Sequence, residues 1–90
     1  PDLVLLDINL RGSSGIDLLQ VIKQDVKLCV IPVLMLSTSR AKADVLASYR
    51  HHANCYLVKP LHYSLFGRVL DEAIHYWLST VEPAPEASHV

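Results

Sequence analysis

The stretch PDLVLLDINLRGSSG, residues 1–15, decides the fold, because a short apolar run passes straight into a carboxylate and a polar loop. The continuous aliphatic run from Leu3 to Leu6 is typical of a strand that is buried on both faces of a parallel sheet. Asp7 follows at once, although aspartate is a poor strand former and is costly to bury unpaired. Ligands of open parallel sheets bind just beyond the carboxyl ends of the strands. Asp7 is therefore the first candidate for a functional residue.

The composition is that of a soluble globular chain with room for one modest core. The 90 residues are 51% hydrophobic and 19% charged, and the formal net charge is −1. This near-neutral charge gives no support for a nucleic-acid surface or a polybasic membrane patch. No apolar run reaches the length that spans a bilayer. We therefore expect no nucleic-acid or membrane partner. Cys29 and Cys55 lack CxxC spacing and are typical of reduced core thiols, which predicts a cytoplasmic protein.

Strands and helices are predicted to alternate along the chain. The expected elements are a strand over 3–6, a helix over 15–25, a strand over 33–36, a helix over 41–51, a strand over 55–58 and a helix over 63–80. Ser14 and Asp17 match a capping box at the start of the first helix. The last helix carries an apolar stripe, made of Phe66, Val69, Leu70, Ala73 and Trp77. This order implies an α/β fold with parallel strands joined by right-handed crossovers.

A reactive side chain follows the carboxyl end of each predicted strand. Asp7 follows the first strand, Ser37 with Thr38 the second, and Lys59 the third. In a parallel sheet these ends share one edge, so a carboxylate, hydroxyls and an ammonium should meet there. Such a set suits a phosphoryl group: the carboxylate can form an acyl phosphate, and the others bind its oxygens. A divalent cation is expected as well, because a bare carboxylate repels a phosphoryl group, and Mg²⁺ prefers oxygen ligands.

Three segments at this edge, LVLLDINL, IPVLMLSTS and ANCYLVKP, resemble the receiver domain of bacterial response regulators in their order and spacing. The resemblance runs from the family's third strand to its last helix. It implies the C-terminal β-α-β-α-β-α portion of a doubly wound, flavodoxin-like parallel sheet. A partial receiver domain would cover residues 1–81, and residues 82–90 would form a disordered tail. The segments HANCYLVKP and AIHYWLSTV look most like those of the small regulators partnered with cyanobacterial phytochromes.

The resemblance implies a role for each matching residue. Asp7 would be the phosphoacceptor, which takes phosphate from a histidine of a sensor kinase. Ser37 would be the switch hydroxyl that swings toward the phosphoryl group, and the Thr38 backbone N–H would bind a phosphoryl oxygen. Lys59 would pair with the phosphate. Tyr56 would be the aromatic residue that turns inward when the hydroxyl moves.

The resemblance also implies a metal site, of which this chain holds only a part. Asp7 and the backbone carbonyl of Asn9 would bind Mg²⁺, whereas the family's two further acidic ligands lie on its first strand, outside this chain. Gly15 matches the glycine that follows the phosphorylation loop. Pro60 matches the residue after a peptide bond that is often cis in the family.

The leading functional hypothesis is a phosphorylation-switched receiver. Its expected partners are a sensor histidine kinase, with a phytochrome as the candidate, and a second copy of the chain. A homodimer is expected because the aliphatic edge of the first strand and part of the last helix would otherwise be uncovered. The alternative is a phosphate-independent interaction module, which the missing acidic pair would favour if the native protein began near Pro1. A phosphatase-like hydrolase would need a second acid where Asn9 stands, so we do not expect an enzyme.

Several of these residues also have purely structural interpretations. An aspartate that closes a strand is often only a turn residue, and it is the register with Ser37 and Lys59 that favours a function for Asp7. Ser39 is expected to cap the following helix. The adjacent pair His51 and His52 lacks the spacing of metal ligands, as do His62 and His75. The aromatic residues of the helices are expected in the core, with Trp77 also a candidate for a partner surface.

Overall fold

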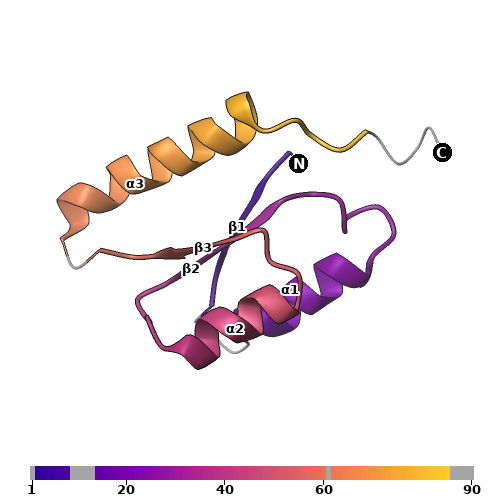
Figure 1. Ribbon diagram of the computed structural model, residues 1–90, viewed down its shortest axis with the longest axis horizontal. Coiled ribbons are helices and arrows are strands. Elements are labelled where there is room, and N and C mark those ends of the chain that lie inside the picture. The colour runs from indigo at the N-terminus through magenta and orange to yellow at the C-terminus, as the bar shows by residue number, and fades with distance from the viewer. Residues whose placement is uncertain (1, 9–13, 61, 86–90) are drawn as a thin grey trace.

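The structure is a computed structural model that describes residues 2–8, 14–60 and 62–85. Its elements are β1 (Val4–Asp7), α1 (Gly15–Gln24), β2 (Val33–Ser37), α2 (Lys42–Arg50), β3 (Cys55–Val58), α3 (Tyr63–His75) and a π-helical turn, η1 (Tyr76–Thr80). The strands are parallel and lie in the order β1-β2-β3. Helices α1 and α2 lie on one side of the sheet and α3 on the other (Figure 1). The predicted α/β alternation is therefore confirmed.

The element boundaries differ slightly from the predicted ones. Pairing between β1 and β2 includes Asp7 and is followed by a hydrogen bond of 3.0 Å from the Ile8 N–H to the Leu36 carbonyl. The first helix ends at Gln24, because the backbone of Asp25 is extended (φ −80°, ψ 130°). The second helix is shorter than the predicted 41–51, and the helix predicted over 63–80 divides into α3 and η1. Residues 86–90 of the predicted tail lie outside the described residues.

The core is built on β2 and the face of the sheet that α1 covers. All five residues of β2 are buried, which suits a strand paired on both sides. Leu6 of β1 lies opposite Met35 of β2, and both belong to one buried cluster with Leu19 of α1. The free thiols of Cys29 and Cys55 are half-buried.

Strand β1 is less buried than the sequence predicts. Leu6 is only 5% exposed, but its neighbour Leu5, which points to the other face, is 38% exposed. Among the described residues β1 pairs with β2 alone, so it forms one edge of the sheet. The prediction of a strand buried on both faces is therefore wrong for the described structure. Complete burial of such a strand requires a second neighbour.

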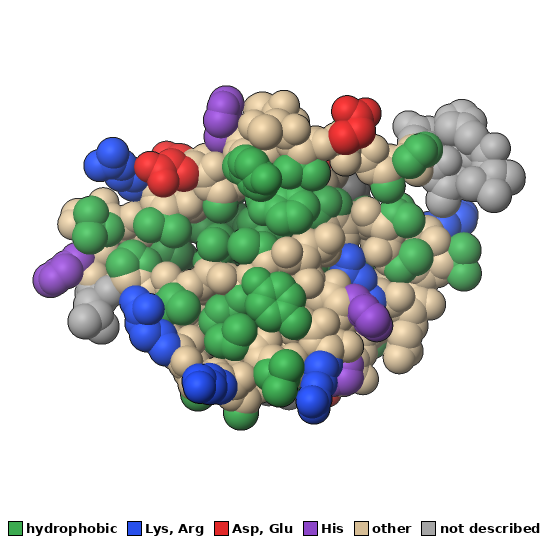
Figure 2. Space-filling view, viewed as in Figure 1, with side chains coloured by type: hydrophobic (Ala, Val, Ile, Leu, Met, Phe, Trp, Pro, Cys, Tyr) green, Lys and Arg blue, Asp and Glu red, His purple; other side chains and the backbone are tan. Residues whose placement is uncertain are grey.

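The predicted apolar stripe of the last helix lies partly buried on the side of the sheet opposite α1 (Figure 1). All five of its residues are half-buried, and none is fully enclosed. Figure 2 shows hydrophobic side chains gathered across the middle of this view, in the region between α3 and the sheet. No described helix has both the length and the apolar character that crossing a membrane requires.

Candidate functional site

The carboxyl edge of the sheet brings together two of the residues that the sequence places there. Asp7 ends β1, and Lys59 directly follows β3. The Lys59 ammonium donates a hydrogen bond to Asp7 Oδ2 and forms an ion pair with it. The Lys59 and Asp7 side chains are 27% and 32% exposed. The carboxylate is therefore held by a cation and remains within reach of solvent.

Strand register explains why residues so distant in sequence meet at this edge. Asp7 lies opposite Leu36, and Ser37 lies opposite Val58, so the three strands end within one residue of one another. The Lys59 N–H donates to the Ser37 carbonyl at 2.7 Å, which continues the ladder for one more residue. The backbone thus fixes where the Lys59 side chain begins.

Ser37 and Tyr56 are linked through Ser39. Ser37 is 1% exposed, and its Oγ accepts a hydrogen bond of 3.0 Å from the Ser39 N–H. The Tyr56 hydroxyl donates to the Ser39 carbonyl at 3.0 Å. Thr38 lies between the two serines and is exposed, so its backbone is placed at the rim of the site. Ser37 and Tyr56, the predicted switch hydroxyl and aromatic residue, therefore both hydrogen-bond Ser39, and their roles stay a prediction.

The prediction that Ser39 caps the second helix is wrong in detail. The N-cap of α2 is Ala41, and no side chain caps it by a hydrogen bond. The Ser39 Oγ instead accepts from the Ala41 N–H at 3.1 Å and donates to Asp44 Oδ2. The hydroxyl lies two residues before the N-cap, because α2 begins at Lys42, one residue later than predicted.

Gly15 brings the start of α1 against the end of β1. Its N–H donates to the Ile8 carbonyl at 2.8 Å. A Cβ at Gly15 would lie 2.3 Å from the Asp7 carbonyl oxygen, which is far inside van der Waals contact. The prediction that Ser14 caps α1 is confirmed, because Ser14 Oγ accepts from the Ile16 N–H at 3.1 Å, although the predicted capping box pairs Ser14 with Asp17. The glycine is therefore required by close approach to the residue that bears the carboxylate.

The described residues match the expected metal site only in part. Asn9 lies outside the described residues, and the described part of the chain holds no group of three His, Cys, Asp or Glu side chains placed to bind a metal ion. Asp7 supplies a carboxylate, which suits Mg²⁺, but it cannot form a complete site alone. The Lys59–Pro60 peptide bond is trans, unlike the expected family feature.

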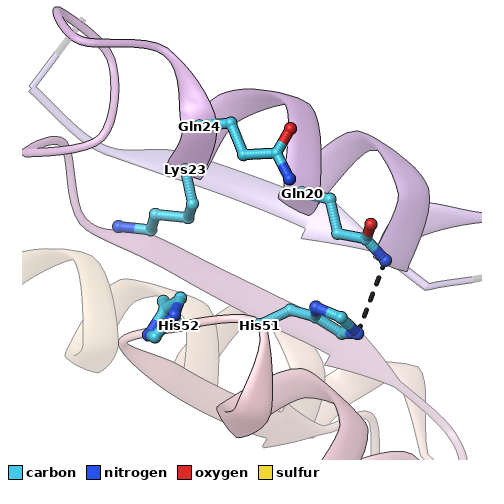
Figure 3. A pocket seen from close by; sticks show the side chains of 5 residues that line it. All are labelled: Gln20, Lys23, Gln24, His51 and His52. Atoms are coloured by element: carbon cyan, nitrogen blue, oxygen red, sulfur yellow. Dashed lines mark hydrogen bonds between the residues drawn. The ribbon is translucent and has the colours of Figure 1, made fainter.

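A shallow pocket of about 230 Å³ lies between α1 and the turn that follows α2 (Figure 3). Lys23 Nζ donates to Asn54 Oδ1 at 2.9 Å and to the carbonyl oxygens of Cys29 and Ile31. Burial lowers the pKa of Lys23. Because its three protons have acceptors, this lysine holds the turn before β2 in place. The pocket is lined by Gln20, Lys23, Gln24, His51 and His52.

Comparison with known families agrees with this geometry. A family model described as the response regulator receiver domain matches residues 1–70. The chain belongs to the response regulator receiver family. It is 42% identical over 81 residues to Response regulator Rcp1 of Synechocystis sp., covering 90% of this chain and 55% of that protein. It is 34% identical over 71 residues to Chemotaxis protein CheY-3 of Vibrio cholerae, covering 79% of this chain and 55% of that protein. The receiver chain thus spans about half the length of these relatives.

Solved receiver structures share the fold. The phosphorylated cyanobacterial phytochrome response regulator RcpA superposes with a TM-score of 0.89 at 40% identity, covering 94% of this chain and 61% of that one. The Mn²⁺-bound form of response regulator Rcp1 gives a TM-score of 0.85, with the same identity and coverage. The flavodoxin-like receiver fold is therefore confirmed, and the chain is a receiver segment of the two-component type.

Proposed function

We propose that this receiver accepts a phosphoryl group on the carboxylate of Asp7. The observation that carries the proposal is the contact between Asp7 Oδ2 and the Lys59 ammonium at the carboxyl edge of the sheet. A carboxylate oxygen attacks phosphorus, the bond from phosphorus to the donor histidine nitrogen breaks, and that nitrogen keeps the electron pair. Lys59 then offsets the charge of the new acyl phosphate, and the Ser37 hydroxyl and Thr38 N–H bind its oxygens in this proposal.

The direct test is the mass of the protein after treatment with acetyl phosphate and Mg²⁺. We expect the complete protein to gain the mass of one phosphoryl group and Asp7→Asn to gain none, because an amide is not a nucleophile of this kind. Asp17→Asn is the matched control, since Asp17 is exposed in the first turn of α1. Phosphate uptake by Asp7→Asn at the wild-type rate would show that another residue is the acceptor.

A divalent cation, Mg²⁺, is proposed as the cofactor of the transfer. Support comes from the carboxylate at Asp7 and from the solved relative that is described as Mn²⁺-bound. The remaining oxygen ligands would come from Asn9 and from residues beyond those described. Mn²⁺ added to the complete protein should broaden the NMR signals of residues next to Asp7 before those of β3. Uniform broadening would count against a site there.

The proposed phosphate donor is a sensor histidine kinase of the phytochrome type in the cytoplasm. Support comes from the likeness to RcpA, which is described as a phytochrome response regulator. A purified cyanobacterial phytochrome kinase should transfer labelled phosphate to the protein faster than a kinase of an unrelated pathway does. Equal rates from both kinases would argue against the phytochrome assignment.

The receiver is proposed to make one covalent transfer and not to act as a turnover hydrolase. The residue two positions after the nucleophile is Asn9, an amide in place of a second acid. Without that acid, a generic phosphate ester lacks a proton donor for its leaving group. A chromogenic phosphate monoester should therefore release no phosphate at a steady rate, and sustained release that Asp7→Asn abolishes would overturn this assignment.

A further inference from the structure

Ser39 hydrogen-bonds to four other residues through its backbone and side chain. Its N–H donates to Ser37 Oγ, and its carbonyl accepts from the Tyr56 hydroxyl, each at 3.0 Å. Its own hydroxyl accepts from the Ala41 N–H at 3.1 Å and donates to Asp44 Oδ2 at 2.5 Å. Its backbone therefore faces the switch residues, while its side chain faces the first turn of α2.

The backbone bonds make Ser39 sensitive to the rotamer of Ser37. Rotation about the Cα–Cβ bond of Ser37 moves its Oγ and so withdraws the acceptor from the Ser39 N–H. Ser37 is 1% exposed, so the space around its hydroxyl offers little room for a replacing water molecule. A backbone N–H left without a partner there is costly. A change at Ser37 therefore favours a shift of the Ser39 backbone.

The side-chain bonds make the start of α2 depend on Ser39. The first N–H groups of a helix have no partner within the helix, and a capping side chain usually satisfies one of them. Here the N-cap is Ala41, whose methyl side chain cannot accept a hydrogen bond from these N–H groups. The Ser39 hydroxyl holds the N–H of Ala41 and the carboxylate of Asp44 in the first turn. A shift of Ser39 therefore acts on both ends of that turn.

We propose that Ser39 is a positioning residue, which carries a change at Ser37 to the first turn of α2 through its side-chain hydroxyl. The inference rests on the proposed function, because it assumes that Ser37 responds to a phosphoryl group on Asp7. It adds a specific route: the hydroxyl of Ser39 couples the site to α2, and its backbone couples the site to Tyr56. Removal of the hydroxyl alone should break the first connection and leave the second intact.

The test combines mass spectrometry with hydrogen exchange on the complete protein, with and without acetyl phosphate and Mg²⁺. In the wild type, phosphorylation should change the exchange rates of the amides of residues 41–45. Ser39→Ala should still gain a phosphoryl group but lose that response, and its Ala41 amide should exchange about threefold to tenfold faster before phosphorylation. The Lys59 amide, which bonds the Ser37 carbonyl, should still respond. Ser39→Thr keeps the hydroxyl and should restore the response.

Ser79→Ala is the matched control, because it removes the hydroxyl of an exposed serine of η1, which lies 3.5 Å from His75 Nδ1 and far from Ser39 in the sequence. Ser79→Ala should behave as the wild type. Two results would overturn the inference: a full response at residues 41–45 in Ser39→Ala, or a response of Ser39→Thr that is no larger than that of Ser39→Ala. In either case a gain of one phosphoryl group would still support the proposed function. A wild-type protein that gains no phosphoryl group would overturn both.

Discussion

At Gly15, the absence of a side chain decides whether α1 can begin beside Asp7. A Cβ there would lie 2.3 Å from the Asp7 carbonyl oxygen and 2.7 Å from the Ile8 Cα, and both atoms belong to the backbone. Neither atom can move away as the end of a flexible side chain can. We expect Gly15→Ala to destabilise the fold by about 1–3 kcal/mol, the usual cost of overpacking, measured as a lower urea midpoint.

Gly67→Ala provides the matched control for that substitution. A Cβ at Gly67 would meet nothing within 4 Å, and the residue lies inside α3. Alanine in an open helix interior stabilises by about 0.5–1 kcal/mol relative to glycine, so the midpoint should rise. Equal midpoints for Gly15→Ala and the wild type would show that the loop before α1 can relax away from the clash.

At the residue scale, the sequence predicts which side chains meet, but it does not predict the hydrogen bonds that the backbone between them forms. The meeting of Asp7 with Lys59 follows from the rule that parallel strands end at one edge. The role of Ser39 could not be predicted, because it depends on the path of the chain between Ser37 and Ala41. A serine that follows a strand carries no signal that separates a helix cap from a bridge to Tyr56.

The turn between α1 and β2 gives a prediction about pH. Hydrogen bonds from the backbone N–H groups of Leu28 and Lys27, at 2.9 and 2.8 Å, lower the pKa of Asp25 from its ordinary value of 3.8. The unfolded chain therefore takes up this proton at a higher pH than the folded chain does. Stability from Asp25 is present above its ordinary pKa and is lost as the pH falls through the lower folded value.

Two substitutions at Asp25 check this prediction through urea midpoints measured between about pH 5 and about pH 2.5. Asp25→Asn keeps an acceptor oxygen but cannot titrate, so its midpoint should fall less steeply with acid than that of the wild type. Asp25→Ala loses both hydrogen bonds and should have a lower midpoint at pH 5. Parallel curves for Asp25→Asn and the wild type would show that this turn does not contribute to acid sensitivity.

At the element scale, the types of the helices and strands were predictable and their ends were less so. The apolar runs and the stripe of α3 follow from the periodicity of hydrophobic residues. The division of the last helix at Tyr76 has no such signal, because the stripe continues through Trp77 across both α3 and η1. The apolar run of β1 alone predicted burial on both faces, whereas the uncovered edge followed only from the strand order of the family, since burial of a strand depends on its neighbours rather than on its own sequence.

Among the described residues, the whole molecule leaves the β1 edge and part of one face of its sheet uncovered. Leu5 is 38% exposed on the side of the sheet where α3 lies, and β1 is an edge strand. Exposed strand edges and large apolar patches favour association with another chain. We expect the 90-residue chain to form a dimer or a larger species in light scattering.

Leu5→Lys should reduce that association, because a charged side chain in the uncovered region opposes close contact with another chain. Val26→Lys is the matched control, since Val26 is 83% exposed in the turn after α1 and should not affect the assembly. A stable and well-ordered wild-type monomer at high concentration would contradict the prediction.

The strand order has a consequence for folding during synthesis, because the strands lie side by side in the same order as in the sequence. As the nascent chain leaves the ribosome, β1 meets β2 as its next strand, and β2 then meets β3. Each pairing closes a loop that spans one helix, so no strand waits for a partner from a distant part of this segment. Loop closure of this size carries a modest entropic cost. The ladder can therefore assemble in step with translation, one βα unit at a time.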